Sequence, residues 1–395
     1  MSWKVMPTLN DLHIVFAGGG TAGHLFPGLA VAAELAALPD APQITFAGSG
    51  KPLEERLVAD AGFGYLPVRC APLPRGMRGM WRFVGRNLSG FQAARRYLQR
   101  NKCNLVVGLG GYASLPTCGA ARTMGIPLVL LEQNVYPGKA NRWLASGAEL
   151  ICAAWAETRK HFHKVGPVRV TGNPIRAGFR RHSNLPEREA SASFIGEAER
   201  NQRRGWRHRI LVLGGSGGAG SLNEFVPRAL YKLRDQLNGW QIVHQTGTRD
   251  VAATEELYHK LALEALVAPF VQNMPSVLRR TDVAICRAGG TTLAELAATG
   301  VPAVLVPYPH AAQDHQRLNA EMFTSSGAAR MVDERNRSTR LDDALARTLF
   351  DLLADAGVRS KMSSAMLQLA RPDAAWQVAM MVHELAGQTA TRKAA

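Results

Sequence analysis

Residues 283–319 combine the side chains and backbone groups that binding a nucleotide sugar requires. The apolar run 283–286 is long enough only for a buried strand, and two glycines break it. Thr291 is a natural N-cap for the helix expected next, and a second buried strand is expected at 303–306. The crossover of such a unit is right-handed, so its two strands run parallel and end at the same edge of the sheet.

This edge collects groups that can bind a diphosphate and a sugar. The glycine turn supplies the backbone amides of Gly289, Thr291 and Thr292 at a helix N-terminus, where anions bind. Glu295 follows one turn into the helix, and a carboxylate can bind a ribose diol at two points. The polar run 310–316 follows the second strand and meets the same edge. We therefore expect a nucleotide-sugar site here.

The same strand, glycine loop and helix start occurs twice, at 18–24 and at 214–220. No acidic residue ends the next strand in either half (43–47 and 241–244), which disfavours NAD. Both loops could still bind phosphate through their amides. The repeat predicts an α/β protein with two doubly wound, Rossmann-like domains that face each other across a cleft.

Domain boundaries follow from this repeat. The N-terminal domain is expected at 1–176, and the polar, arginine-rich stretch 177–209 reads as a linker. The C-terminal domain is expected at 210–371, followed by a last helix and tail at 372–395. Within that last part, the helical pattern covers about 374–385.

Composition bounds the class of protein. The chain has 395 residues, 46% of them hydrophobic and 20% charged, which is typical of a soluble protein with more than one core. The uncharged run 103–121 holds Asn, Ser, Pro and four glycines, so we expect no transmembrane helix. The five cysteines are scattered and there is no Asp-x-Asp motif. We therefore expect free thiols, no metal and no cofactor.

The net charge of +16 is unevenly distributed, because no acidic residue lies between Asp60 and Glu132. Basic and large apolar residues mixed in this way are typical of a surface that docks on anionic lipid. An amphipathic helix over about 84–99 with a solvated basic face is the alternative, and nucleic-acid binding is a third. The interleaved residues are Arg75, Arg78, Arg82, Arg86, Arg95, Arg96, Arg100 and Lys102 with Met77, Met80, Trp81, Phe83, Leu88, Phe91 and Tyr97.

Seven ordered motifs closely resemble the MurG family, which adds GlcNAc to undecaprenyl-pyrophosphoryl-MurNAc-pentapeptide in peptidoglycan synthesis. The resemblance covers roughly residues 11–385. The motifs are GGGTAGHLFPGLAVA (18–32), GLGGYASLP (108–116), EQN with AN (132–141), GNPIR (172–176), GGSGGAGSLN (214–223), RAGGTTLAE (287–295) and DHQRLNA (314–320).

The resemblance implies a glycosyltransferase-B fold with the acceptor in the N-terminal domain and UDP-GlcNAc in the C-terminal one. It also implies inversion at the anomeric carbon to give a β-1,4 linkage. The last helix would return to the first domain. The chain would bind peripherally to the cytoplasmic face of the inner membrane, with a role in cell shape and division.

A donor site follows residue by residue from these motifs. Ser216, the loop amides and Arg176 would stabilise the UDP leaving group as charge builds on its diphosphate. Gln316 and Asn319 would hold the GlcNAc hydroxyls, unless they only make hydrogen bonds at the helix start. For Arg176 the alternative is an interdomain salt bridge. The donor-binding residues implied are Arg176, Gly215, Ser216, Gly289, Thr291, Thr292, Glu295, His315, Gln316 and Asn319.

His24 is the expected general base for the acceptor hydroxyl, because the pKa of an imidazole suits this task. His24 also follows a glycine loop at the ligand edge of the sheet. Alternatively, it caps the helix or binds the acceptor pyrophosphate. The acceptor pocket would be lined by Gly20, Thr21, Tyr112, Asn134 and Asn141, with Tyr112 equally compatible with a packed rim aromatic.

The chain departs from the family pattern at three places. Gly217 stands where Gln is expected, Leu131 stands where a polar residue is usual, and the stretch 177–209 is longer than usual. Other enzymes of the same fold stay open as alternatives, namely a glycolipid glycosyltransferase or a UDP-GlcNAc 2-epimerase. The basic, apolar stretch disfavours the epimerase, since a soluble substrate does not need it.

Overall fold

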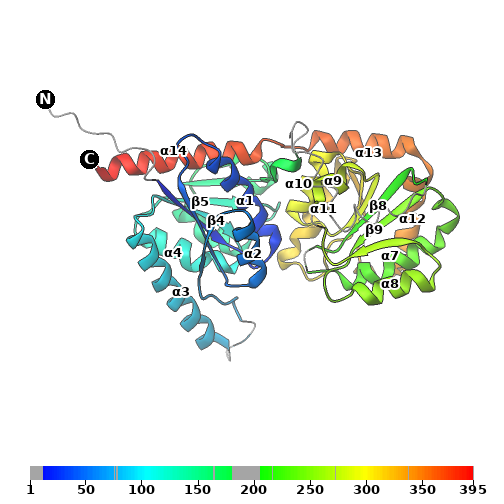
Figure 1. Ribbon diagram of the computed structural model, residues 1–395, viewed down its shortest axis with the longest axis horizontal. Coiled ribbons are helices and arrows are strands. Elements are labelled where there is room, and N and C mark those ends of the chain that lie inside the picture. The colour runs from blue at the N-terminus through cyan, green and yellow to red at the C-terminus, as the bar shows by residue number, and fades with distance from the viewer. Residues whose placement is uncertain are drawn as a thin grey trace. The chain divides into compact units, whose positions relative to one another are not determined.

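The computed structural model describes residues 12–74, 76, 79–162, 165–179, 205–215, 217–271, 273–336 and 338–394. The chain divides into two compact units (Figure 1). Unit 1 comprises residues 1–176 with 371–395, and unit 2 comprises residues 177–370. Each unit contains one parallel sheet with helices around it, so the predicted α/β class with two Rossmann-like domains is confirmed.

The sheet of unit 1 has seven strands in the order β3-β2-β1-β4-β5-β6-β7, all paired in parallel. The order reverses direction between β1 and β4, which is where ligands bind in doubly wound sheets. The strands are β1 His13–Gly18, β2 Gln43–Gly48, β3 Gly64–Pro67, β4 Leu105–Gly110, β5 Leu128–Glu132, β6 Leu150–Ala153 and β7 Val168–Val170.

Both faces of this sheet are buried, which explains why its central strands are apolar throughout. Ile14 and Phe16 of β1 belong to the core on one face, and Val15 and Ala17 belong to the core on the other. Helices cover each face. They are α1 Ala22–Ala36, α2 Pro52–Asp60, α3 Met80–Arg100, α4 Leu115–Thr123, α5 Lys139–Leu144 and α14 Ala374–Ala394.

The last helix, α14, lies beside α1 on one face of the unit 1 sheet (Figure 1). Val378, Val382 and Ala386 are completely buried in the same core as β1. The predicted helix ended near residue 385, whereas α14 continues to Ala394. Ala386 already lies in the core, so packing holds the helix beyond the point where its sequence pattern weakens.

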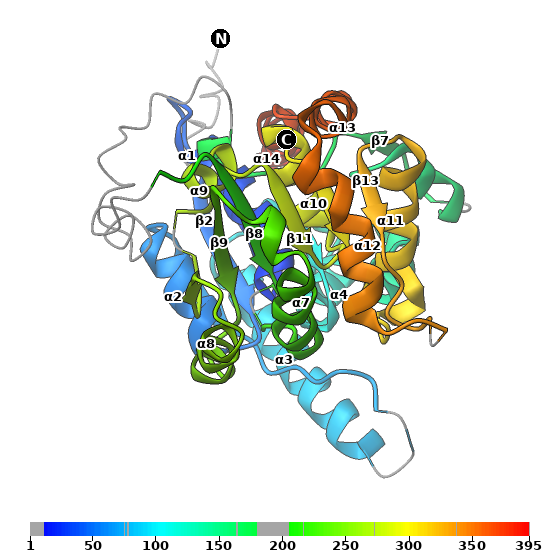
Figure 2. The same ribbon diagram turned by 90° about the vertical axis from the view of Figure 1, so that its right-hand side faces the viewer.

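Helix α3 is longer than the predicted 84–99 and only its C-terminal half is packed. Gly90, Ala94 and Leu98 are buried, and Gly90 leaves no room for a side chain because a Cβ there would lie 1.9 Å from the carbonyl oxygen of Arg69. The N-terminal half projects beyond the other elements of unit 1 (Figure 2). This half carries Trp81 and Leu88, which are exposed.

The sheet of unit 2 has six parallel strands in the order β10-β9-β8-β11-β12-β13. Its direction reverses between β8 and β11. The strands are β8 His208–Leu213, β9 Trp240–Gln245, β10 Ala265–Ala268, β11 Val283–Cys286, β12 Ala303–Leu305 and β13 Ala329–Met331. The helices are α7 Gly220–Lys232, α8 Val251–Lys260, α9 Met274–Arg279, α10 Gly290–Thr299, α11 His315–Ser325, α12 Leu341–Ala354 and α13 Ala356–Gln368.

The predicted linker 177–209 is only partly described, because residues 180–204 lie outside the described residues. At its start, Ala177–Phe179 forms a short 3-10 helix that belongs to unit 2, with Phe179 buried. The guanidinium of Arg279 donates a hydrogen bond to the Gly178 carbonyl. Among the helices that the structure describes, none combines the length and the apolar character needed to span a bilayer.

Candidate active site

Helix α10 begins at Gly290, with Gly289 as its N-cap. The prediction that Thr291 is the N-cap was therefore wrong. Gly289 already adopts the extended backbone of an N-cap, with φ −74° and ψ 138°, and Thr291 lies inside the first turn. The N-terminal amides of α10 come from 290–292. Glu295, one turn further, is buried with an exposed fraction of 7%.

The loop after β12 is tied to its neighbours by the predicted sugar-binding residues. The side-chain oxygen of Gln316 accepts a hydrogen bond from the Tyr308 amide at 2.9 Å, so its amino group is the end left to meet a ligand. Nδ1 of His315 lies 2.7 Å from the Ala312 carbonyl oxygen, which only accepts. His315 therefore carries its proton on Nδ1 and presents Nε2 as an acceptor.

Asn319 lies deeper than a sugar contact requires. Its exposed fraction is 0%, and Nδ2 donates to the Ala288 carbonyl oxygen at 3.0 Å. This bond joins α11 to the turn that precedes α10. In this arrangement Asn319 holds the two loops together, and its predicted contact with the sugar stays a prediction.

Arg287 is a residue of this edge that we did not single out from the sequence. Its guanidinium donates to the carbonyl oxygens of Val306 and Pro307 at 3.0 and 3.2 Å, to Glu334 at 2.6 Å and to Ser221 Oγ at 2.7 Å. It therefore joins the loops that follow β11, β12 and β13 to the start of α7. The only sequence signal was an arginine at a strand end inside a glycine-rich motif.

The glycine loop after β8 is supported from behind by buried polar side chains. Gln245 Nε2 donates to the Gly215 carbonyl oxygen at 3.2 Å. His244 is fully buried between Tyr258, at 3.0 Å, and Asn223 Oδ1, at 3.1 Å, and burial lowers the pKa of its imidazole to about 3. Ser216 itself lies outside the described residues.

The corresponding edge of unit 1 brings the predicted base and acceptor residues together. Thr21 Oγ1 and His24 Nδ1 are 2.9 Å apart. A Cβ built on Gly110 would lie 3.4 Å from the His24 ring and 3.5 Å from the Asn141 side chain. The ring of Tyr112 lies 3.5 Å from the corresponding position on Gly20. The ends of β1 and β4 thus gather these predicted residues on one edge.

Glu132, which ends β5, organises the two predicted amide side chains. Its carboxylate accepts hydrogen bonds from Asn134 N and Nδ2 at 3.0 and 3.1 Å, from Gly138 N at 2.9 Å and from Asn141 Nδ2 at 2.9 Å. Burial raises the pKa of this carboxyl group. Within the described part of the chain, the buried Oδ1 of Asn141 has no hydrogen-bond partner.

The first glycine loop is closed by Glu54, a second residue that the sequence pattern did not reveal. The Gly20 amide donates to Glu54 Oε1 at 2.5 Å, so it is not open to phosphate as we expected. Arg176, the last residue of this unit before α14 rejoins it, stacks its guanidinium over the ring of Phe26 at 4.5 Å.

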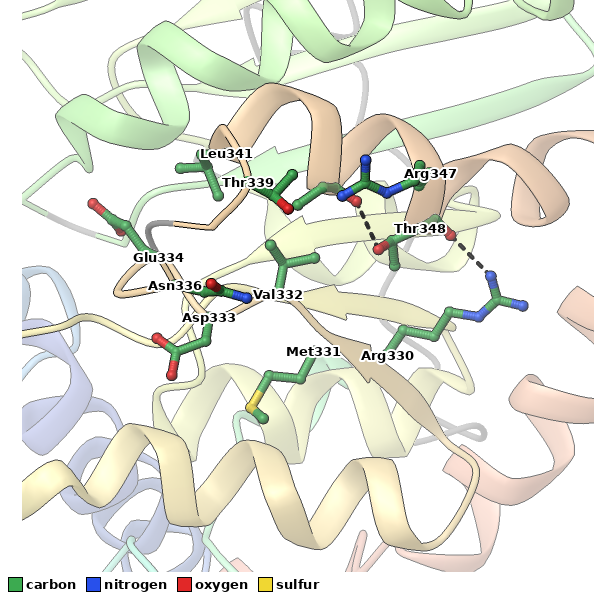
Figure 3. A pocket seen from close by; sticks show the side chains of 11 residues that line it. Arg330, Met331, Val332, Asp333, Glu334, Asn336, Thr339, Leu341, Arg347 and Thr348 are labelled. Atoms are coloured by element: carbon green, nitrogen blue, oxygen red, sulfur yellow. Dashed lines mark hydrogen bonds between the residues drawn. The ribbon is translucent and has the colours of Figure 1, made fainter.

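A cavity of about 420 Å³ lies at the end of β13, beside α12 (Figure 3). Arg330, Met331 and Asp333 line one side and Thr348 lines the other. None of the predicted site residues that the structure describes lines it. Its lining includes Glu334, the ion-pair partner of Arg287.

Both halves of the chain match known domains. Residues 14–152 match the glycosyltransferase family 28 N-terminal domain, and residues 209–378 match the glycosyltransferase family 28 C-terminal domain. The chain is 37% identical to a protein of Geobacter sulfurreducens. The aligned 366 residues cover 92% of this chain and 96% of the relative. A protein of Pseudomonas syringae pv. tomato is 35% identical over 381 residues, which covers 95% and 99%. Both are named UDP-N-acetylglucosamine--N-acetylmuramyl-(pentapeptide) pyrophosphoryl-undecaprenol N-acetylglucosamine transferase.

Solved structures agree with this match. Acinetobacter baumannii MurG superposes with a TM-score of 0.69 at 30% identity, over 94% of this chain and 99% of that one. A UDP-GlcNAc 2-epimerase of Neisseria meningitidis, solved with UDP-GlcNAc, superposes with a TM-score of 0.65 at 12% identity, over 94% and 99%. The second likeness shows the fold alone.

Proposed function

This chain belongs to glycosyltransferase family 28, and we propose that it transfers GlcNAc from UDP-GlcNAc to N-acetylmuramyl-(pentapeptide) pyrophosphoryl-undecaprenol. The observation that carries this proposal is the identity of 34–37% to relatives named for that activity, over at least 92% of the chain. The membership predicted from the seven sequence motifs is confirmed. In the cell, this reaction would serve peptidoglycan synthesis.

The donor half of the reaction is proposed for unit 2. The first-turn amides of α10 would bind the UDP diphosphate, because a helix N-terminus and fixed N–H donors stabilise the charge that builds on a leaving group. Glu295 would accept from the ribose hydroxyls, and Gln316 and His315 would contact the sugar. Ser216, Gly215 and Arg176 would stabilise the diphosphate. Asn319 would hold the GlcNAc hydroxyls together with Gln316, and its bond to Ala288 joins α11 to the turn before α10.

The acceptor half is proposed for the edge of unit 1. His24 would take the proton of the acceptor hydroxyl as the new glycosidic bond forms, and the bond to UDP breaks on the opposite side of the anomeric carbon. This single displacement inverts the configuration and gives a β-1,4 linkage. The contact between Thr21 Oγ1 and His24 Nδ1 would orient the ring for this transfer. Gly20, Tyr112, Asn134 and Asn141 would surround the acceptor.

We propose that the N-terminal half of α3 docks on anionic lipid at the cytoplasmic face of the inner membrane. Trp81 is 88% exposed and Leu88 is 54% exposed, with Val84 between them and the exposed Arg82 and Arg86 alongside. Apolar side chains insert below lipid headgroups while arginines pair with their phosphates. This arrangement would bring the acceptor site to a lipid-linked substrate, and we propose no nucleic-acid partner.

Co-sedimentation with vesicles tests the docking proposal. The double variant Trp81→Ser, Leu88→Ser should not bind phosphatidylglycerol vesicles. High salt should weaken the binding of the unmodified chain. The matched control is Trp376→Ser, because Trp376 is a half-exposed tryptophan on α14 of the same unit. Equal binding by the double variant and by the control would contradict a docking role for α3.

Release of UDP from UDP-GlcNAc tests the reaction itself. The purified chain is incubated with and without a short-chain polyprenyl-pyrophosphoryl-MurNAc-peptide, in EDTA. We expect acceptor-dependent release and a disaccharide product. UDP release that does not depend on the acceptor would instead indicate the epimerase or a hydrolase. Acceptor-dependent release that EDTA abolishes would contradict the expectation that the reaction needs no metal.

A further inference from the structure

We propose that Glu54 is a positioning residue for the acceptor half of the reaction. Its carboxylate occupies the place at the first glycine loop where a phosphate would otherwise bind, and so fixes the backbone that carries Thr21 and His24. The inference rests on the proposed function, since it assigns Glu54 to the step in which His24 receives the proton. It also removes the Gly20 amide from the groups that could bind the acceptor diphosphate.

Four hydrogen bonds converge on this one carboxylate. Oε1 accepts from the Gly20 amide at 2.5 Å and from Ser49 Oγ at 2.6 Å. Oε2 accepts from the Ser49 amide at 2.8 Å and from the Tyr65 hydroxyl at 2.9 Å. Burial raises the pKa of Tyr65, which keeps its hydroxyl a donor. Glu54 therefore ties the ends of β1, β2 and β3 together from the first turns of α2.

The loop is shaped around this carboxylate. Glu54 is only 4% exposed. A Cβ on Gly19 would lie 2.9 Å from its carboxylate atoms, and a Cβ on Gly48 would lie 2.6 Å from Oε2. The buried side chains therefore leave no room for a Cβ at either position, and Gly19 also has a positive φ of 151° that favours glycine. On the outer side, Lys51 Nζ donates to the Gly20 carbonyl oxygen at 2.8 Å.

A phosphate cannot share this position. An anion at the Gly20 amide would lie next to a buried carboxylate, and like charges at that distance repel strongly where water is scarce. An unpaired carboxylate pushed out of its hydrogen bonds would also be costly. The Gly20 amide therefore acts as a support, and the acceptor diphosphate must find its donors among the other groups of this edge.

The fixed amide is close in sequence to the reacting group. Gly20 directly precedes Thr21, the N-cap of α1, and Thr21 Oγ1 lies 2.9 Å from His24 Nδ1. A movement of the Gly20 backbone is therefore passed to the imidazole through one residue and one hydrogen bond. Misplacement of a catalytic group by about 1 Å can cost about 100-fold in rate.

Glu54→Gln is the sharpest test, because either orientation of the new amide places an NH₂ against a backbone donor. Facing one way, it opposes the Gly20 amide, and facing the other way, it opposes the Ser49 amide. We expect kcat to fall about 10- to 100-fold while the KM for UDP-GlcNAc changes less than about twofold. The matched control is Glu55→Gln, one residue further on the same helix and exposed.

Two further variants separate positioning from folding. Tyr65→Phe removes one of the four donors and should lower kcat only a few-fold, with the fold intact. Glu54→Ala leaves a hole of carboxylate shape, so acetate should restore part of its kcat and should not affect Glu55→Ala. If Glu54 only stabilised the fold, Glu54→Ala would instead lose UDP binding and kcat in parallel, and acetate would not restore its kcat.

Two outcomes overturn the inference in different ways. If the unmodified chain turns over the acceptor and Glu54→Gln is as active as Glu55→Gln, Glu54 does not position the site and the proposed function stands. If the unmodified chain releases no UDP in the presence of the acceptor, the proposed function fails, and the role of Glu54 in it fails with it.

Discussion

The two glycine loops of this chain share a sequence pattern but differ in what occupies them. In the first, at 18–20, the chain's own Glu54 accepts from the Gly20 amide. In the second, at 214–219, the described residues make hydrogen bonds only to backbone and to the amide of Gln245, and no acidic side chain among them contacts the loop. The first loop is therefore bound by a carboxylate of the chain itself, whereas in the second loop the Gly214 and Gly218 amides donate to backbone carbonyl oxygens.

This difference shows how one local motif serves two purposes. A glycine loop before a helix presents an excess of backbone donors, which favours the binding of a negatively charged group. In unit 2 we propose that the anion is the substrate diphosphate, so the loop is a binding device. In unit 1 the negative group is the buried carboxylate of Glu54, and we propose that it fixes the loop that carries His24. Four variants test this contrast.

The largest effect is expected for His24→Ala. Loss of a general base lowers kcat by about 10²- to 10⁴-fold, whereas UDP binding should be unchanged because the donor groups proposed on unit 2 are intact. Isothermal titration with UDP alongside steady-state kinetics measures both quantities. Normal turnover by this variant would remove the chemical role of the first loop.

Glu295→Ala should weaken UDP binding about 10- to 100-fold, because two hydrogen bonds from ribose to a carboxylate are lost. The variant should no longer distinguish UDP from 2′-deoxy-UDP, which competition binding measures. Glu224→Ala serves as the control, since Glu224 is a half-exposed glutamate on α7 of the same unit. Retained discrimination in Glu295→Ala would place the ribose elsewhere.

Gly218→Ala should destabilise the second loop by about 2 kcal/mol, because this glycine has a positive φ of 76° and its Cβ would meet the Thr246 carbonyl oxygen at 2.2 Å. Gly217→Ala is the paired control, as nothing lies within 4 Å of its Cβ position. Urea unfolding of both variants gives the difference. Equal stability would mean that the loop backbone rearranges freely.

The last prediction concerns pH and the buried histidine behind the second loop. Burial lowers the pKa of His244 to about 3, against about 6.5 in the unfolded chain, so below pH 6.5 only the unfolded state takes up this proton. Stability should therefore fall on acidification by up to about 1.4 kcal/mol per pH unit between those values.

Unfolding midpoints in urea at pH 7 and pH 5 measure this slope. His244→Gln should flatten it, while His259→Gln, a change at an exposed histidine on α8, should keep the slope of the unmodified chain. His13 in unit 1 is also buried with a lowered pKa, so part of the slope should persist in His244→Gln. A slope that did not change in His244→Gln would show that His244 is protonated without cost.

Much of this arrangement was readable from the amino-acid sequence, because the deciding features are local. Buried parallel strands appear as short apolar runs, and the helix after each glycine loop follows from residues that are adjacent in the chain. Because parallel strands end at a common edge, His24, Asn141 and Tyr112 could be expected together without a structure, and they are found together.

Contacts between distant loops were decided only by the tertiary structure. Glu54 meets Gly20 across 34 positions of sequence, Arg287 meets Glu334 across 47, and Asn319 is buried against Ala288 across 31. Each partner is chosen by which strands lie side by side, and no periodicity within one segment carries that information. Sequence patterns alone therefore identify where backbone donors are exposed, whereas the packing of neighbouring strands determines whether a substrate or the chain itself satisfies them.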